Sequence, residues 1–161
     1  MTWAAVGIGA NLGDAERSVR DAIDALSGLP ATRLVQASRL YRTPAWGVTA
    51  QPDFINAVAV LDTRLTARAL LEALLDIERA CGRVRIDGER WGPRTLDLDV
   101  LLYGDAIIDE PGLRIPHPHL HERAFALLPL LDAWPVAEIP GIGPARECAA
   151  AMAVDGIEPL P

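Results

Sequence analysis

The stretch TLDLDVLLY, residues 95–103, decides which fold this 161-residue chain adopts. Its first half alternates apolar and acidic residues and its second half is continuously apolar, which is typical of a central strand with one partly polar face. Because side chains two positions apart on a strand point to the same face, we expect Leu98 and Val100 to enter the core. Asp97 and Asp99 then leave the sheet together on the opposite face.

Outward from this strand, apolar periodicity predicts five more elements. In chain order they are a strand at 3–8, a helix at 15–27, strands at 32–41 and 54–61, and a helix from residue 66 to about 81. This order of strands and helices is the signature of a ferredoxin-like α+β layer with an antiparallel sheet. Residues 112–121 are expected to be irregular around two prolines, and additional C-terminal helices are predicted at about 122–131 and after Pro144.

Length and composition predict a single domain over residues 1–161. Half of the residues are hydrophobic and the mean hydropathy is +0.18, which is enough for a sizeable core. Cys81 and Cys148 form no paired motif, which favours a reducing compartment. No signal segment and no apolar run of about 18 residues is apparent, so we expect a cytoplasmic protein without a membrane span.

The charged residues exclude several classes of protein. All 15 basic side chains are arginine, so no lysine is available for a phosphate-binding loop or a Schiff base. The formal net charge is −7, whereas nucleic acids and anionic membranes require a positive surface. We therefore expect neither as a partner.

Asp97 and Asp99 predict a magnesium site. Their carboxylates leave one strand face about 6.5–7 Å apart along the backbone and repel each other unless a cation lies between them. Mg²⁺ prefers such oxygen ligands and is usually shared with substrate phosphates. The alternative is that both aspartates are simply the solvated positions of a half-exposed strand.

Four of the 15 arginines lie directly ahead of the two aspartates: Arg83, Arg85, Arg90 and Arg94. Their mutual repulsion would be relieved by a polyphosphate, because guanidinium groups bind phosphate oxygens bidentately. A metal–nucleotide site needs cationic side chains that bind the phosphates and carboxylates that bind the metal, and this stretch contains both. The alternative is that these arginines pair with Asp87, Glu89 and other surface acids.

A second set of residues suits a flat heterocycle. Residues 42–53 form a long predicted loop, and long loops in compact domains are often functional. Asn56 follows inside an apolar strand, where an amide is costly to bury without partners, and it could hydrogen-bond a ring. Phe54 lies on the same face and could stack on that ring. The alternative is that Phe54 is an ordinary aromatic residue of the core and that Asn56 is hydrogen-bonded within the protein.

The alternating residues His117, His119 and His121 suggest zinc, but the flanking prolines and the lack of a further ligand disfavour it. His117 is better explained as a phosphate contact alongside Arg123. Gly7, Gly9 and Gly13 are spaced as GxGxxxG, which does not fit the dinucleotide-binding motif.

Taken together, the motifs resemble those of the 6-hydroxymethyl-7,8-dihydropterin pyrophosphokinase family of folate biosynthesis. They are GANLGD (9–14), YRTPAWG (41–47), QPDFINAV (51–58), RWGPRTLDLDVLLYG (90–104) and IPHPHLHERAFALLPL (115–130). The resemblance covers residues 1–132, and residues 133–161 carry no motif. It implies ATP as co-substrate, two Mg²⁺ ions, a hydroxymethyl dihydropterin as the other small-molecule substrate, and a monomer.

The resemblance also implies residue roles. Asp97 and Asp99 would hold both magnesium ions and act in catalysis with Arg83 and Arg94. The implied ATP-binding residues are Leu71, Glu78, Arg83, Arg85, Trp91, Arg94, Val100, His117 and Arg123. The implied pterin-binding residues are Thr43, Ala45, Trp46, Phe54, Asn56, Trp91, Asp97 and Phe125, with the ring between the two phenylalanines. The chain departs from the commoner pattern at Ala10, Phe54, Leu75, Gly112 and Arg114, so the adenine-side contacts are open.

Two other functions remain open. A nucleotidyltransferase uses a similar aspartate pair but attacks the α-phosphorus of ATP and releases pyrophosphate. A non-catalytic ligand-binding module on the same fold would release nothing, so the reaction products distinguish all three functions.

Overall fold

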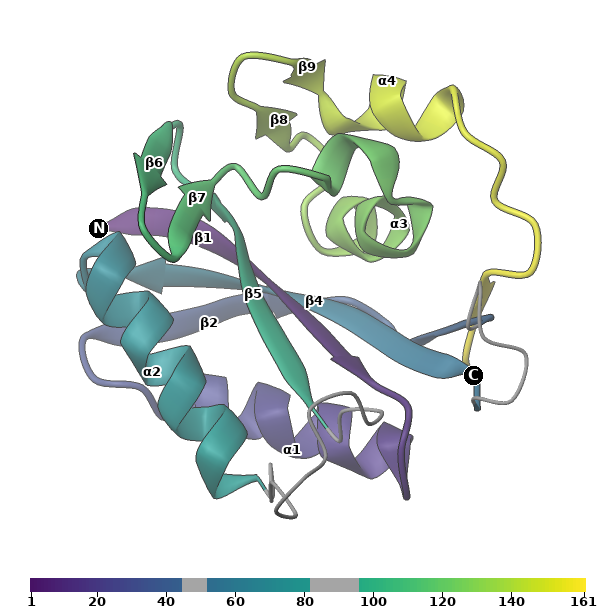
Figure 1. Cartoon of the computed structure of the whole chain (residues 1–161), viewed down its shortest axis with the longest axis horizontal. Helices are drawn as coiled ribbons and strands as arrows, with labels where there is room; N and C mark the ends of the chain where they lie inside the picture. Colours follow the sequence, from purple (N-terminus) through teal and green to yellow (C-terminus); the bar gives the residue numbers. More distant parts are fainter. Residues whose placement is uncertain (45–51, 82–95) are drawn as a thin grey trace.

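The computed structural model describes residues 1–44, 52–81 and 96–161 (Figure 1). The strands are β1 (Thr2–Ala10), β2 (Thr32–Ala37), β3 (Tyr41–Thr43), β4 (Phe54–Thr63), β5 (Asp97–Tyr103), β6 (Ile108–Glu110), β7 (Leu113–Ile115), β8 (Glu138–Ile139), β9 (Gly143–Pro144) and β10 (Glu158–Pro159). The helices are α1 (Ala15–Ser27), α2 (Ala67–Ala80), a 3₁₀ turn at Leu120–Glu122, α3 (Ala124–Ala133) and α4 (Ala145–Ala150).

The central sheet is antiparallel at every pairing. Its order is β10-β3-β4-β1-β5, and β2 also pairs with β4, beside the residues of β4 that β3 leaves uncovered. Strands β5, β1, β4 and β2 therefore lie in the order of the ferredoxin-like fold, and the predicted fold class is confirmed. Among the described strands of this sheet, β5 pairs with β1 alone.

The two long helices begin and end where the sequence provides caps. Asp14 accepts a hydrogen bond from the backbone N–H of Arg17 at 3.1 Å, and Gly28 follows the last residue of α1. Thr66 caps α2 in the same way through the N–H of Ala69, also at 3.1 Å. Both helices were predicted from their apolar stripes, and both predictions are confirmed.

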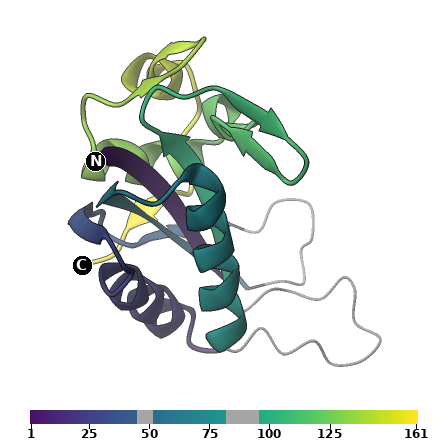
Figure 2. The ribbon, with the colours of Figure 1, turned by 90° about the vertical axis from the view of Figure 1, so that its left-hand side faces the viewer.

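One face of the sheet forms a closed core with α1 and α2 (Figure 2). It buries alternate residues of the long strands, among them Ala4, Val6, Ile8, Ala57, Ala59, Leu98 and Val100. Leu26 of α1 and Leu70 and Leu74 of α2 are fully buried against them. Leu98 and Val100 thus point into the core, as predicted.

The opposite face is divided into two halves. In one half α3 and α4 cover Ala5, Val60 and Leu102 through buried residues such as Leu127 and Leu130. The other half carries glycine and polar side chains, and it opens into the cavity described below. The site therefore occupies the part of the sheet that α3 does not fill.

The single strand predicted at 32–41 was wrong, because it is two strands, β2 and β3. Ala37 pairs with Ala59 and Tyr41 with Asn56, so the chain carries one extra residue between these pairs. Ser38 fills the interruption, since its hydroxyl accepts the N–H of Val58 at 2.9 Å and its own N–H donates to the Val58 carbonyl at 2.8 Å.

The irregular segment predicted at 112–121 was also partly wrong. Strands β6 and β7 form a hairpin, and Gly112 occupies its turn with φ of 75°. The 3₁₀ turn and α3 replace the single helix predicted at about 122–131, while the helix after Pro144 is confirmed as α4. Among the described residues, no helix is long and apolar enough to cross a membrane.

Candidate active site

The site is built on a row of residues across β5, β1, β4 and β3. Gly9 pairs with Asp97 on one side and with Asn56 on the other, and Asn56 pairs in turn with Tyr41. One step along, Gly7 pairs with Asp99. Because each acidic residue faces a glycine, no side chain of β1 stands between the carboxylates and Asn56.

The space above Gly9 is required by the asparagine. A Cβ at this position would lie 2.8 Å from Asn56 Oδ1, which is closer than atoms normally approach. Asn56 Nδ2 donates to Thr43 Oγ1 at 2.8 Å, so the amide is held between the neighbouring strands. Gly9 therefore permits the orientation of Asn56, and Thr43 maintains it.

A cavity of about 380 Å³ lies over this row. The strands contribute the floor, and residues at and beside α3 contribute the opposite wall. Its lining comprises Gly7, Ile8, Gly9, Thr43, Pro44, Phe54, Asn56, Ala57, Val58, Asp97, Asp99, Leu101, His117, Leu120, Arg123, Phe125 and Ala126. The volume and the mixture of aromatic and hydrogen-bonding groups suit a small heterocyclic ligand.

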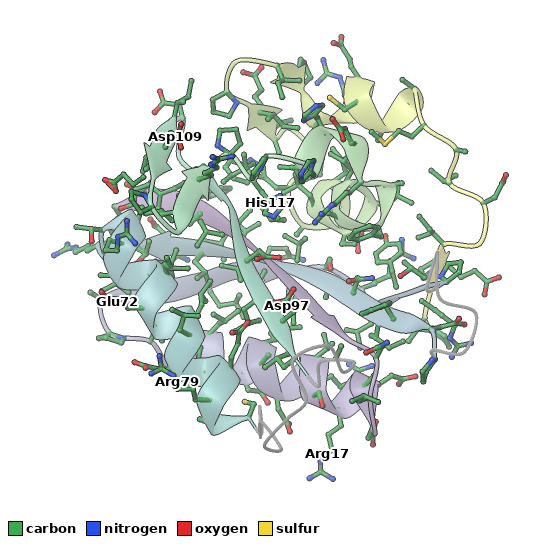
Figure 3. All side chains as sticks on the ribbon, in the orientation of Figure 1. Arg17, Glu72, Arg79, Asp97, Asp109 and His117 are labelled. Atoms are coloured by element: carbon green, nitrogen blue, oxygen red, sulfur yellow. The ribbon has the colours of Figure 1, made fainter. Side chains whose placement is uncertain are left out.

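A second cavity of about 270 Å³ adjoins the first. Its lining comprises Leu71, Asp99, Val100, Gly112, Leu113, Arg114, His117 and Pro118. Asp99 and His117 line both cavities, so the two spaces meet at these side chains. Figure 3 shows Asp97 on β5 and His117 on the segment that leads into α3.

The surroundings of His117 favour its neutral form. Burial lowers its pKa below the ordinary 6.5, the positive charge of Arg123 and the neighbouring His119 add to this effect, and Asp97 opposes it. The His117 Nδ1 accepts the backbone N–H of His119 at 3.2 Å. A neutral imidazole that accepts at Nδ1 carries its proton on Nε2, which leaves this nitrogen as a hydrogen-bond donor.

The aromatic wall of the first cavity includes residues from distant parts of the chain. Phe54 begins β4, and Phe125 lies in the first turn of α3. The Arg123 guanidinium carbon lies 5.6 Å from the centre of the Phe125 ring. The cavity therefore combines two aromatic rings with the amide of Asn56.

Glu78 lies beneath the aspartates, on the core side of β5. Its side chain is 2% exposed, and Oε2 accepts the backbone N–H of Leu98 at 2.8 Å. Leu98 separates Asp97 from Asp99, so this carboxylate holds the strand at the point where both aspartates emerge. Glu78 lines neither of the two cavities.

The structure brings most of the predicted site residues together. The first cavity includes Thr43, Phe54, Asn56, Asp97, Asp99, His117, Arg123 and Phe125, and the second includes Leu71, Asp99, Val100 and His117. Gly112 and Arg114, which depart from the family pattern, also line the second cavity. Of the other predicted residues, Glu78 is described but lines neither cavity, and the rest lie outside the described ranges: Ala45, Trp46, Arg83, Arg85, Trp91 and Arg94.

Sequence reasoning missed the role of Gly7 and Gly9. The residues were compared with a dinucleotide-binding motif, which they do not fit, and Gly9 was quoted in the GANLGD motif without a role. Two glycines at alternate positions of a strand place both gaps on one face, and that spacing was the available signal. Leu101, Leu113 and Leu120 were also missed, because nothing distinguishes an apolar cavity wall from a core residue in the sequence.

The aspartate pair fits a shared cation. Within residues 1–44, 52–81 and 96–161, no three His, Cys, Asp or Glu side chains gather as a complete metal site. Asp97 and Asp99 lie on one strand face and both line the first cavity. Two carboxylates that open into a ligand cavity are the donor set that Mg²⁺ uses when substrate oxygens and water complete its shell.

Comparison with known proteins identifies the family to which this chain is similar. Residues 5–135 match the family described as 7,8-dihydro-6-hydroxymethylpterin-pyrophosphokinase (HPPK). A protein of Pseudomonas aeruginosa, named 2-amino-4-hydroxy-6-hydroxymethyldihydropteridine pyrophosphokinase, is 47% identical over 97% of this chain and 95% of its own length. One of the same name from Methylorubrum extorquens is 44% identical over 98% of each chain.

The fold is also similar to that of a solved protein. The crystal structure of wild-type Plasmodium falciparum HPPK-DHPS superposes with a TM-score of 0.72 over 92% of this chain, at 13% sequence identity. This chain spans 44% of that protein, less than half of its length. At this identity the likeness concerns the fold alone.

Proposed function

This chain belongs to the 7,8-dihydro-6-hydroxymethylpterin-pyrophosphokinase family, and we propose that it transfers pyrophosphate from ATP to the hydroxymethyl group of 6-hydroxymethyl-7,8-dihydropterin. The products are the pterin diphosphate and AMP. The observation that carries the proposal is the pair of adjoining cavities that meet at Asp99 and His117. An acceptor and a donor bound in these spaces would meet beside the aspartates.

We assign the first cavity to the pterin. Phe54 and Phe125 supply apolar faces for the ring, and Asn56 supplies a donor and an acceptor for its polar edge. Thr43 fixes the amide through the 2.8 Å hydrogen bond to Asn56 Nδ2. Ala45, Trp46 and Trp91 remain proposed pterin contacts on the basis of the sequence resemblance.

We assign the second cavity to the nucleotide. Leu71, Val100 and Leu113 provide an apolar wall for the base, and Asp99 and His117 lie where the cavity joins the pterin site. His117 Nε2 would donate to a phosphate oxygen, because the neutral ring carries its proton there. Arg123, with the sequence-predicted Arg83, Arg85 and Arg94, would bind the phosphates.

The reaction is an in-line displacement at phosphorus. The pterin hydroxyl oxygen forms a bond to the β-phosphorus of ATP, the bond from that phosphorus to the α,β-bridging oxygen breaks, and the hydroxyl proton is released. AMP leaves with the bridging oxygen. The chain's part is to orient both substrates in the adjoining cavities and to place guanidinium groups where negative charge develops.

Asp97 and Asp99 would hold two Mg²⁺ ions, which neutralise phosphate charge and act as Lewis acids at the reacting centre. Glu78 would support this site from the core side, because its carboxylate fixes the backbone between the two aspartates. We further propose that the enzyme is a cytoplasmic monomer whose partners are small molecules, without a nucleic acid or membrane partner.

Product analysis tests the proposal. The unaltered chain is incubated with ATP, Mg²⁺ and hydroxymethyl dihydropterin, and nucleotides are separated over time. We expect AMP in amounts equal to the pterin diphosphate, and no AMP without the pterin. Release of pyrophosphate would indicate nucleotidyl transfer, which the family match does not favour, and absence of any product would indicate a binding module.

A further inference from the structure

The C-terminal segment, residues 156–160, returns from α4 to the sheet and covers the outer edge of β3 (Figure 1). Glu158 pairs with Arg42 and Pro159 with Tyr41 in antiparallel register. The backbone N–H of Leu160 donates to the carbonyl of Leu40 at 2.8 Å. The segment carries no motif that the sequence analysis could assign.

Strand β3 is short: Tyr41 and Thr43 are buried, but its backbone pairs with long strand β4 on one side only. It contains three residues and pairs with β4 on its inner side. A short edge strand with free backbone groups is a weakly held element, and pairing on its second side restricts its movement. The opposite charges of Glu158 and Arg42 face each other as register partners, which favours this pairing over others.

The residues that β3 positions belong to the first cavity. Thr43 ends the strand, and Pro44 follows it directly; both line the cavity. Thr43 is 2% exposed and accepts the hydrogen bond that orients Asn56. A displacement of β3 would therefore move one wall of the cavity and release the asparagine amide.

The C-terminal segment also touches this wall directly. Gly156 has φ of 82°, and a Cβ there would lie 3.1 Å from Pro44 Cγ and 3.6 Å from Pro44 Cδ. The backbone at Gly156 thus packs closely against the proline ring, and a methyl group there would press on Pro44. Glycine satisfies both requirements, since it tolerates the left-handed conformation and it has no side chain to push on Pro44.

We propose that the C-terminal segment 156–160 is a positioning element for the pterin pocket, which fixes Thr43 and Pro44 through β3 and Gly156. The proposal rests on the proposed function, because it takes the first cavity as the pterin site. It gives the motif-free C-terminal region a role in acceptor binding, whereas the nucleotide cavity shares no lining residue with β3 or Pro44.

A pair of glycine substitutions tests this role. Gly156→Ala is compared with Gly141→Ala, because Gly141 has nearly the same φ, 80°, and the nearest atom to its Cβ is Ile107 Cδ1 at 4.0 Å. Both positions therefore have a left-handed φ that disfavours alanine, and only at Gly156 would the added methyl group also press on a residue of the pocket. We expect Gly156→Ala to raise the KM for the pterin about tenfold and to leave the KM for ATP unchanged, while Gly141→Ala alters neither.

A second variant that ends at Asp155 removes the pairing with β3. We expect a larger increase in the KM for the pterin, again without a change in the KM for ATP. Equal pterin KM values for the Gly156 and Gly141 variants, in a chain that forms AMP normally, would overturn the positioning role alone. An unaltered chain that forms no pterin-dependent AMP would overturn the proposed function and, with it, this role.

Discussion

The same strands form both faces of the central sheet, but one face packs in the core and the other lines the cavity. Toward α1 and α2, β1 presents Val6 and Ile8, which are at most 2% exposed and pack in a continuous core. Toward the cavity, the same strand presents Gly7 and Gly9, whose lack of side chains admits Leu101 and Asn56 beside two carboxylates. Strand alternation therefore lets one segment stabilise the fold with one face and form the site with the other.

The comparison teaches that stability and function should respond to different substitutions. Removing volume from the core face leaves a cavity and lowers the free energy of unfolding. Adding or removing atoms on the cavity face changes ligand contacts at positions that contribute little to packing. The predictions below test this separation, from the largest expected effect to the smallest.

The largest effect is expected on the cavity face of β5. Asp97→Ala and Asp99→Ala should each lower kcat/KM by at least about 1,000-fold, or ~4 kcal/mol in the barrier, because each removes a ligand of the proposed magnesium ions. The rate of pterin-dependent AMP formation measures the loss, and the thermal midpoint shows that the fold survives. Retained Mg²⁺-dependent turnover in either variant would contradict the metal assignment.

A strand aspartate away from the site provides the control. Asp62 lies on β4 and pairs with Arg33 at 3.5 Å, at the end of the strand remote from Asn56. Asp62→Ala should keep the kcat/KM of the unaltered chain. An equal loss in this variant would show that the aspartate effects come from general charge and not from the site.

On the core face, Leu74→Ala should separate stability from activity in the other direction. Leu74 is fully buried between α2 and the sheet, so truncation should lower the free energy of unfolding by about 2–5 kcal/mol. Denaturant titration measures the loss, and kcat/KM well below the melting temperature should not change. The neighbouring Leu75 is 36% exposed, and Leu75→Ala should alter stability by less than about 0.5 kcal/mol.

Gly9→Ala should fill the gap that this glycine leaves between Asp97 and Asn56. The added Cβ would lie 2.8 Å from Asn56 Oδ1 and should force this amide away from its bond with Thr43. We expect the KM for the pterin to rise about tenfold, or ~1.4 kcal/mol, with a smaller change in the KM for ATP. Steady-state kinetics with each substrate varied in turn would measure both values.

Gly28→Ala is the matched control for that substitution. Gly28 follows α1 with φ of −97°, and a Cβ there would meet Ala25 O at an ordinary 3.6 Å. This variant should bind pterin like the unaltered chain. If Gly9→Ala also binds pterin normally, the gap above Gly9 is not needed for the acceptor.

The smallest effect is expected on the pH dependence of the free energy of unfolding, to which His117 contributes. The folded chain lowers the pKa of His117 below 6.5, so the unfolded chain binds more protons as the pH falls. Stability contributed by this group is therefore present above about pH 6.5, declines below it, and levels off below the lowered pKa. The free energy of unfolding of His117→Gln should fall less than that of the unaltered chain between about pH 7.5 and about pH 5.5. Parallel curves for both chains would contradict the lowered pKa.

Much of the fold could be predicted from local patterns. The spacing of Val19, Ala22 and Leu26 indicated α1, and Asp14 indicated its first turn. The alternation at Asp97 and Asp99 indicated a strand with a polar face. These features depend on residues within one or two turns of each other, and periodicity records them directly.

Features that depend on distant residues could not be predicted in the same way. The division of residues 32–41 into two strands depends on Ser38 and Val58, which are 20 positions apart. The C-terminal pairing with β3 joins Glu158 to Arg42, and no local pattern around either residue indicates the other. Such contacts form because they satisfy backbone groups and shape in three dimensions.

The sequence by itself therefore determined the order of the long strands and helices, the outward direction of the aspartates, and the chemistry of the residues near them. Only the tertiary structure decided that Gly9 lies between Asp97 and Asn56, and that Asp99 and His117 join two cavities. The physical reason is that strand period is a property of consecutive residues, whereas a cavity is a property of what the surrounding elements leave unfilled.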